Sequence, residues 1–315
     1  MQSVLPPRWK TLIAFAIIYF VWGSTFYAIR VGVHDVPPLL LAAARFTFAG
    51  LALFLWAVAQ GNRVPRQREW AAIAVMALLI FVVDYGILFL AERRVASGTA
   101  AVILATIPAF MALAEILFLR TSRLTWRLGS ALLVGLAGVV VLVDPSLGMV
   151  GAPVYALGAM GLIVSAISWS VASVLSKKLP LPSSKVMSAA AQMLVGGLML
   201  CVVAAAAGEA RGFRIATVSR DAWFALAYLT VAGSIVGFTA YTWLIHHHSP
   251  TQVGTYAYVN PVVAVGVGHF LGGEVLDMRT ALGTALVLVS VIVIATRRGT
   301  EPRAAELSRR RRIQG

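Results

Sequence analysis

Residues 97–119 have the sequence SGTAAVILATIPAFMALAEILFL, in which Glu115 is the only charged side chain. A helix needs about 20 apolar residues to cross the hydrocarbon core of a bilayer. Inside that core only helices and closed barrels satisfy their own backbone hydrogen bonds. The stretch therefore predicts a membrane-spanning helix, and much of the remaining chain has the same character.

Hydrophobic residues make up 60% of the 315 positions, and charged residues make up 12%. An ordinary soluble domain has about 25% charged residues, because its exterior must be wetted. We therefore predict an all-α integral membrane protein with no inserted soluble domain. Short links rich in Pro, Gly, Ser, Arg or Lys separate ten apolar runs, at residues 12–33, 37–59, 70–90, 97–119, 125–143, 153–175, 184–207, 222–245, 251–271 and 281–295.

The formal net charge of +14 would suggest a nucleic-acid partner in a soluble protein. Here Lys and Arg lie mostly between the apolar runs, as topology signals and lipid-headgroup contacts do. Counted over alternate segments, one set holds 18 of the 26 basic residues and the opposite set holds 6. The positive-inside rule then places residues 1–11 and the basic tail at residues 297–315 in the cytoplasm. We expect membrane lipid as a partner and no nucleic acid.

The two halves of the chain resemble each other. Landmark residues recur with equal spacing: Trp22 with Arg30 and Trp169 with Lys177, eight residues apart, and Ser97 with Pro108 and Pro250 with Pro261, eleven apart. The copies are offset by five spans, an odd number, so the second copy must be inverted in the membrane. We predict repeats at residues 12–143 and 152–296, with a substrate site near the midplane where they meet.

These landmarks belong to a longer pattern. It comprises Trp22-Gly-Ser-Thr-Phe, Arg45-Phe46, Ala91-Glu92, Ser97-Gly-Thr-Ala-Ala, Pro108, Tyr256-Ala-Tyr-Val-Asn-Pro261 and Gly272-Gly-Glu274. In these residues the chain resembles the EamA family of the drug/metabolite transporter superfamily, and within it a branch of bacterial inner-membrane transporters. The resemblance implies a ten-helix, multi-pass fold with both termini in the cytoplasm and a central cavity. It also implies export of amino acids, related metabolites or drugs, coupled to protons or driven by the solute gradient.

The chain departs from the family pattern at two positions. Arg120 stands where the first repeat often has an acidic residue like Glu274, which weakens any matched role for paired acidic residues. Asp84 stands where relatives usually have a small or uncharged residue, so the family implies no role for it.

Ionisable groups within a membrane are costly and are functional hypotheses by default. At about 1.5 Å per helical residue, Arg45 lies roughly 12 Å and Asp84 roughly 9 Å from the outer ends of neighbouring spans. One interpretation is that Asp84 titrates as substrate or protons pass, with Arg45 tuning it. The other is a permanent Arg45–Asp84 ion pair that holds the two spans together.

Other candidates lie near the middle of the spans. Pro108 and Pro261 are predicted hinges, because proline removes a backbone donor and kinks a helix. Asn260 would satisfy a carbonyl freed by Pro261 or face a polar solute. Mid-span aromatic residues suit a cavity for partly apolar solutes, although each also fits ordinary core packing. The candidate substrate-binding aromatics are Trp22, Tyr85, Trp169, Tyr241 and Tyr258.

Rival functions have less support. The chain has no G-x-S-x-G, H-E-x-x-H or P-loop motif, so an intramembrane enzyme has no visible catalytic, metal or cofactor site. Cys201 is the single cysteine, which excludes an intramolecular disulfide. A channel-like facilitator would need a pore-lining ring of like residues. We therefore predict a secondary transporter that exports small solutes by alternating access, as a monomer or homodimer, with protons as a candidate coupling ion.

Overall fold

The computed structural model describes residues 7–119, 126–143, 152–248, 253–254, 256–275 and 277–295. Within these ranges the regular structure is helical throughout. The first half contains α1 (Arg8–Ala16), η1 (Ile17–Val21), α2 (Trp22–Asp35), α3 (Pro38–Ala59), α4 (Gln67–Ala77), η2 (Leu78–Tyr85), α5 (Gly86–Glu92), α6 (Ser97–Leu104), α7 (Ile107–Ala114), η3 (Glu115–Leu119) and α8 (Trp126–Val143). The second half contains α9 (Ala152–Leu175), α10 (Lys185–Ala206), η5 (Ile215–Thr217), α11 (Arg220–Tyr228), η6 (Leu229–Val236), α12 (Gly237–His247), α14 (Tyr256–Gly272) and α15 (Met278–Ala295).

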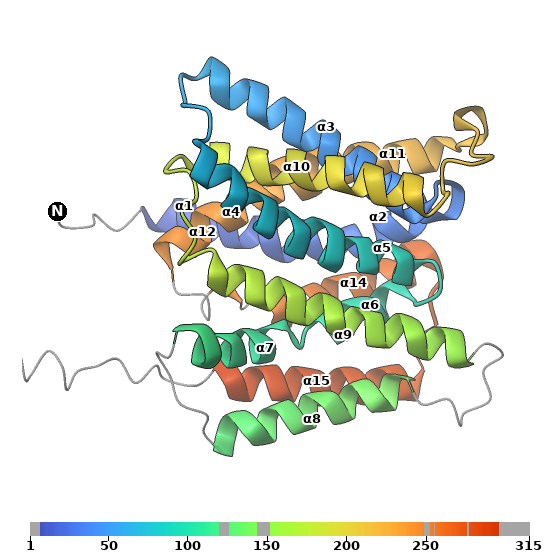
Figure 1. Ribbon diagram of the computed structural model, residues 1–315. Helices are drawn as coiled ribbons and strands as arrows, with labels where there is room; N and C mark the ends of the chain where they lie inside the picture. The colour runs from blue at the N-terminus through green and yellow to red at the C-terminus, as the bar shows by residue number, and fades with distance from the viewer. Residues whose placement is uncertain are drawn as a thin grey trace, which may run out of the picture.

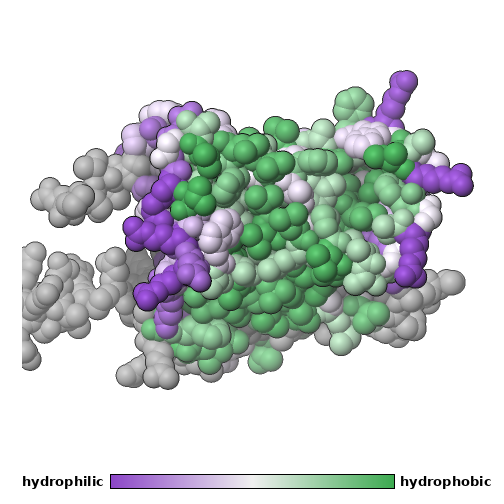
Figure 2. Space-filling model, turned by 45° about the horizontal axis from the view of Figure 1, so that its top comes forward, coloured by the Kyte–Doolittle hydropathy of each residue, from purple (hydrophilic) through white to green (hydrophobic). Residues whose placement is uncertain are grey.

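Several of these elements join into longer continuous helices, here called rods, whose lengths match the thickness of a bilayer. Seven are long and apolar enough to span a membrane: Arg8–Asp35, Pro38–Ala59, Gln67–Glu92, Ser97–Leu119, Ala156–Leu175, Lys185–Ala206 and Arg220–His247. Two shorter apolar helices, Val259–Gly272 and Ala281–Ser290, accompany them. Figure 2 shows the consequence on one face, a broad apolar belt with hydrophilic side chains at its two ends.

The ends of the helices follow from local sequence. Pro38 occupies the first position of α3, where its missing N–H would have no intrahelical partner. Ser184 and Ser219 cap α10 and α11 by accepting from the backbone nitrogens of Met187 and Ala222. Each cap satisfies a backbone donor at the start of a rod, so the rods begin at defined residues.

The rods lie side by side, with α3 at one edge of the bundle and the α8–α15 pair at the opposite edge (Figure 1). α3 packs along α10, and α14 packs against α2 and α6 in the interior. Contacts at both ends show that the first rod, Arg8–Asp35, runs antiparallel to the rod Arg220–His247. Asp35 accepts from the backbone of Ser219 at one end, whereas Thr11 meets His248 at the other.

The α3–α10 contact is unusually close and nearly reciprocal. Gly50 is the thirteenth residue of α3, and a Cβ there would lie 2.6 Å from the Cα of Leu194, the tenth residue of α10. Gly197 is the thirteenth residue of α10, and its Cβ would lie 2.8 Å from the Cα of Thr47, the tenth residue of α3. Only glycine allows two backbones to approach this closely. The matched positions mean that the two helices cross through equivalent residues.

Two features of the rods depart from the predictions. The expected kink in residues 97–119 is a break, because α6 ends at Leu104 and α7 begins at Ile107. The third rod of each half contains an eight-residue π-helical segment, η2 or η6, and the apolar pattern gave no sign of either. π-helical turns leave backbone groups displaced from the α-helical ladder and often occur at functional sites.

Candidate functional site

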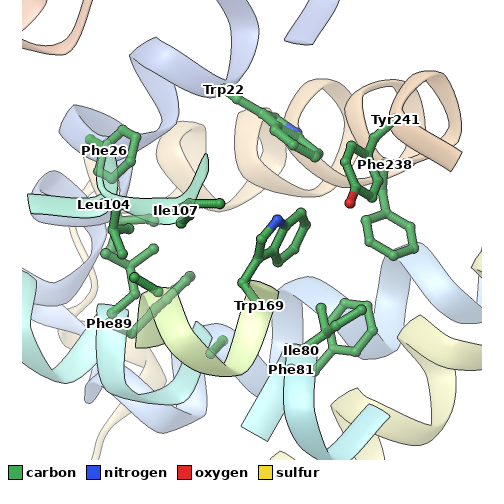
Figure 3. Close-up of a cluster of buried hydrophobic side chains, with 14 of the residues drawn as sticks. Trp22, Phe26, Ile80, Phe81, Phe89, Leu104, Ile107, Trp169, Phe238 and Tyr241 are labelled. Carbon is green, nitrogen blue, oxygen red and sulfur yellow. The ribbon is translucent and has the colours of Figure 1, made fainter. Parts of the chain in front are cut away.

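Aromatic side chains from both halves meet at the centre of the bundle (Figure 3). The ring of Trp22 lies edge-on to Trp169 at a centroid distance of 5.7 Å and an interplanar angle of 84°. Tyr241 and Tyr256 lie 5.2 and 5.4 Å from Trp22, and Tyr85 lies 6.1 Å from Trp169. These separations are typical of favourable aromatic pairs. Trp22, Trp169 and Tyr241 are thus brought together as the sequence predicted, with Tyr85 beside them.

Hydrogen bonds fix the orientation of two of these rings. Nε1 of Trp22 donates to the carbonyl oxygen of Gly233, within η6, at 3.0 Å. Gly237, which follows η6, leaves space for the indole, since a Cβ there would lie 2.9 Å from its Cδ1. The hydroxyls of Tyr241 and Ser173 are 2.9 Å apart. The π-helical segment and two small residues therefore position the cluster.

Beside the cluster lies a small cavity of about 50 Å³, here called the central cavity. Ligand pockets for drug-sized molecules are typically about 300–1,000 Å³, so the space in this conformation suits only a few water molecules. The residues that line it come from α2, η2, α5, α6, α7, α9 and α14: Trp22, Thr25, Phe26, Asp84, Tyr85, Leu88, Ala101, Leu104, Ala105, Ile107, Trp169, Tyr256, Ala257, Asn260 and Pro261.

Asp84 is the only acidic or basic side chain among the described residues that line this cavity. It is the seventh residue of η2 and is 4% exposed. Its Oδ1 accepts a hydrogen bond from the Ser165 hydroxyl on α9. A buried carboxylate next to a neutral hydroxyl is an unusual and costly arrangement in a membrane protein.

Arg45 is fully buried in α3 and lies outside the lining of the central cavity. Its Nε donates to the Ser234 hydroxyl at 2.8 Å. Its guanidinium carbon lies 4.7 Å from the ring centre of Phe46 and 5.1 Å from that of Tyr85. The ion pair considered for Arg45 and Asp84 is not formed among the described residues, because each has its own serine partner instead.

The remaining predicted residues lie on α7 and α14. Pro261 is inside α14, and Asn260 beside it joins this helix to the first rod. With its amide turned toward them, Asn260 donates to the carbonyl oxygens of Ile18 and Tyr19 at 3.1 and 2.9 Å. Pro108 lies in the first turn of α7, just after the break. The backbone of Tyr258 belongs to α14, but its side chain lies outside the described part of the chain.

A polar cluster ties four rods together at one end of the bundle. Glu274 accepts from the Ser97 backbone nitrogen and hydroxyl at 3.0 and 2.6 Å, and from the Gly98 nitrogen at 3.2 Å. Arg30 Nε lies 3.5 Å from the same carboxylate. Glu92 is buried close by, at 1% exposure. Glu274 thus caps the N-terminus of α6, which lines the cavity.

Sequence reasoning missed the small polar partners. Ser165, Ser173 and Ser234 are not among the predicted site residues, although their hydroxyls bond to Asp84, Tyr241 and Arg45. Serines buried within apolar spans were the available signal. No three His, Cys, Asp or Glu side chains in the described ranges are grouped to hold a metal ion.

A bundle of membrane-length helices around a buried aromatic and acidic site defines a multi-pass membrane protein of the solute-carrier kind. The chain belongs to the EamA-like transporter family, whose model matches residues 9–144 and 156–296. It is 37% identical to the inner membrane transporter YedA of Escherichia coli over 279 residues, 88% of each chain. It is 23% identical to the transporter YvbV of Bacillus subtilis, covering 95% of this chain and 96% of that one.

The fold has a counterpart among solved structures. A crystal structure of a protein 24% identical in sequence aligns with a TM-score of 0.65, over 96% of this chain and 98% of its own. The family and the relatives confirm the predicted membrane transporter rather than an enzyme. The predicted multi-pass location in the bacterial inner membrane agrees with the place named for the E. coli relative and with the seven apolar rods.

Proposed function

We propose that the protein is a secondary transporter that exports small metabolites, such as amino acids or drug-like solutes, by alternating access. The solute would bind in the central cavity between two inverted five-helix repeats. The observation that carries this proposal is the cavity itself, a narrow space within the bundle that is lined by residues from both matched regions of the chain. Trp22 and Trp169, equivalent in the repeat pattern, are in contact beside it.

Several features support the inverted repeat. The family model matches the chain twice. α3 and α10 are both 22 residues long and cross at equivalent glycines. The third rods both contain an eight-residue π-helical segment. Two copies with an odd number of spans each would have opposite orientations in the membrane.

Alternating access is supported by how narrow the central cavity is. A solute larger than a few waters cannot fit unless the walls separate. At one end, two backbone N–H groups and a hydroxyl at the start of α6 donate to the Glu274 carboxylate, which follows α14. The break between α6 and α7 and the proline within α14 lie next to the cavity. Pro108 and Pro261 would serve as hinges, since both interrupt the backbone hydrogen bonds of rods that line the site.

The orientation follows from charge. Arg8 at the start of α1 and Ala295 at the end of α15 lie at the same end of the bundle (Figure 1). The excess of Lys and Arg in the segments at this end would place it in the cytoplasm. The Glu274 cluster would then close the outer side. Protons as coupling ions, and a monomeric or homodimeric state, stay predictions.

The test uses purified protein in liposomes loaded with a defined mixture of isotope-labelled amino acids and aromatic amines. Efflux is measured by mass spectrometry, with and without an imposed pH gradient. A carrier shows efflux that accelerates when the same unlabelled solute is present outside, because the loaded site returns faster. Protein-free liposomes are the control. Efflux that is insensitive to outside solute would favour a channel-like facilitator, and no efflux of any solute would contradict transport of these classes.

A further inference from the structure

The central cavity contains an acidic group with no basic partner among the described residues. Asp84 is 4% exposed and lines the cavity. Its carboxylate accepts a hydrogen bond from the Ser165 hydroxyl, which supplies no charge. None of the ion pairs within the described residues includes Asp84. A buried ion without a counter-ion carries a large desolvation cost, so the site favours the arrival of a positive charge.

The described part of the chain does not provide that charge in this conformation. The described side chains that line the cavity include no Lys, Arg or His. Arg45 lies on α3, outside the lining, where its Nε is bonded to Ser234 and its guanidinium is packed among the rings of Phe46, Tyr85 and Phe89. Moving it to Asp84 would break these contacts. Asp84 therefore either holds a proton or pairs with a positive charge that the solute brings.

The other walls of the cavity suit a cation as well. Trp22, Trp169, Tyr85 and Tyr256 all line it and pack against one another. Aromatic faces carry partial negative charge and attract ammonium groups, and they also bury apolar carbon. A carboxylate next to several aromatic rings thus offers two kinds of attraction to the same ligand.

We propose that the transported solute carries a positively charged amine on an apolar, preferably aromatic, body, and that Asp84 is its counter-ion. This inference rests on the proposed function for its biological meaning, but the binding preference can be measured separately. None of the described residues that line the cavity is basic, so the carboxylate of an amino acid would enter it without a counter-ion. A simple amine should therefore bind better than the corresponding zwitterion.

Three probes of nearly equal shape separate these cases: phenethylamine, phenylalanine and 3-phenylpropionate. At neutral pH they are a cation, a zwitterion and an anion. Trp22 and Trp169 lie in the site, so binding to purified protein in detergent is followed by tryptophan fluorescence and verified by calorimetry. A hydrogen-bonded ion contributes about 1.5–3 kcal/mol, which corresponds to about tenfold to hundredfold in affinity. We expect phenethylamine to bind the wild-type protein at least tenfold more tightly than either other probe.

Variants assign this preference to Asp84. Asp84→Asn keeps the size and can still accept from Ser165, so we expect it to lose about tenfold or more in affinity for phenethylamine. Asp84→Glu keeps the charge and should retain the preference for the amine. Asp221→Asn removes a carboxylate from the exposed first turn of α11 and is the matched control. Unchanged amine affinity in Asp84→Asn would overturn the proposal.

The wild-type measurement decides even if a variant fails to fold. Equal affinity for the three probes, tighter binding of the anion, or no binding of the amine each overturns the proposal. Flux in proteoliposomes then tests transport separately. Selective amine binding without flux contradicts the proposed function and leaves the cation site standing. Efflux of 3-phenylpropionate as fast as that of phenethylamine contradicts the cation site and leaves transport standing.

Discussion

The Glu274 cluster predicts a conformational equilibrium that one substitution should shift. Glu274 connects the end of α14 to the start of α6, a helix that lines the central cavity. Opening the cavity toward this end requires the two rods to separate. Glu274→Gln keeps the shape of the side chain but removes its charge. We expect the variant to spend more time open at this end.

The size of the shift follows from the contacts that change. The carboxylate accepts three hydrogen bonds, and bonds to a charged acceptor are stronger than neutral ones by roughly 0.5–2 kcal/mol each. The Arg30 ion pair is left out of the sum, since the Arg30 side chain is 39% exposed and exposed pairs contribute little. Because the amide keeps one acceptor oxygen, we expect a loss of about 2 kcal/mol. That corresponds to a rise of roughly 30-fold in the ratio of open to closed protein.

The assay uses the fact that Cys201 is the only cysteine. It is replaced in a Cys201→Ser background, and Leu88→Cys introduces a thiol at a buried position that lines the cavity. The rate of reaction with a charged, water-soluble thiosulfonate, measured on purified protein in detergent, reports the open population. We expect this rate to rise by roughly 30-fold in Glu274→Gln.

Glu209→Gln is the matched control. Glu209 also accepts two backbone N–H groups at a helix start, those of Leu39 and Leu40 on α3, at the same end of the bundle. It does not hold a rod that lines the central cavity. It should lose similar bonds without changing the labelling of position 88. Equal labelling rates in wild-type protein and Glu274→Gln, or an equal rise in both variants, would refute the reasoning.

Two further outcomes test the packing. Gly50→Ala and Gly197→Ala should each destabilise the protein by about 1–3 kcal/mol through overpacking. The double variant should lose less stability than the sum of the two, because separating α3 from α10 once relieves both clashes. Unfolding in SDS measures this, and Gly266→Ala is the control because a Cβ at Gly266 meets open space. Arg45→Lys should lose about 1–3 kcal/mol, because an ammonium neither stacks on rings as a guanidinium plane nor keeps the Nε bond to Ser234; thermal unfolding unchanged from wild type would contradict this.

The sequence predicted the membrane-spanning rods well, because bilayer thickness imposes a length that composition reveals directly. Its boundaries were short at polar ends: the run predicted at residues 70–90 extends over Gln67–Glu92. Glu69 explains one such extension, since its carboxylate accepts the Arg66 nitrogen at 2.7 Å and so helps to start the helix three residues before the predicted apolar run. Apolarity alone does not register such capping groups.

The sequence pointed to several of the residues that lie together in the candidate site, but it did not predict their partners. Arg45 and Asp84 were singled out because charge is costly in a membrane, and both are buried. Their partners Ser234 and Ser165 lie 189 and 81 positions away in the sequence. Partner choice depends on how η2 and η6 turn their side chains. A π-helical segment adds a residue to a turn, so it changes facing in a way that an α-helical periodicity cannot predict.

The two halves have matching π-helical segments, but the side chains at equivalent positions of these segments differ. Asp84 is the seventh residue of η2, and the seventh residue of η6 is Ile235. Ile235 lines a separate apolar groove of about 770 Å³, together with Ile17 and Trp243. In the proposed inverted repeat, the carboxylate therefore has no counterpart in the second half. A solute with one charged end would bind in one orientation only, whichever side of the cavity opens.

This asymmetry makes a final prediction. Exchanging the residues, in Asp84→Ile with Ile235→Asp, keeps the composition and places the carboxylate at the equivalent position. If η2 and η6 were interchangeable, amine binding would survive the exchange. Ile235 faces the apolar groove and not the central cavity, so we expect the exchanged protein to lose phenethylamine binding. We also expect it to be less stable than the Asp84→Ile variant alone, because the new carboxylate would be an unpaired charge among apolar groups. Retained amine affinity in the exchanged protein would show that the recognition site is symmetric.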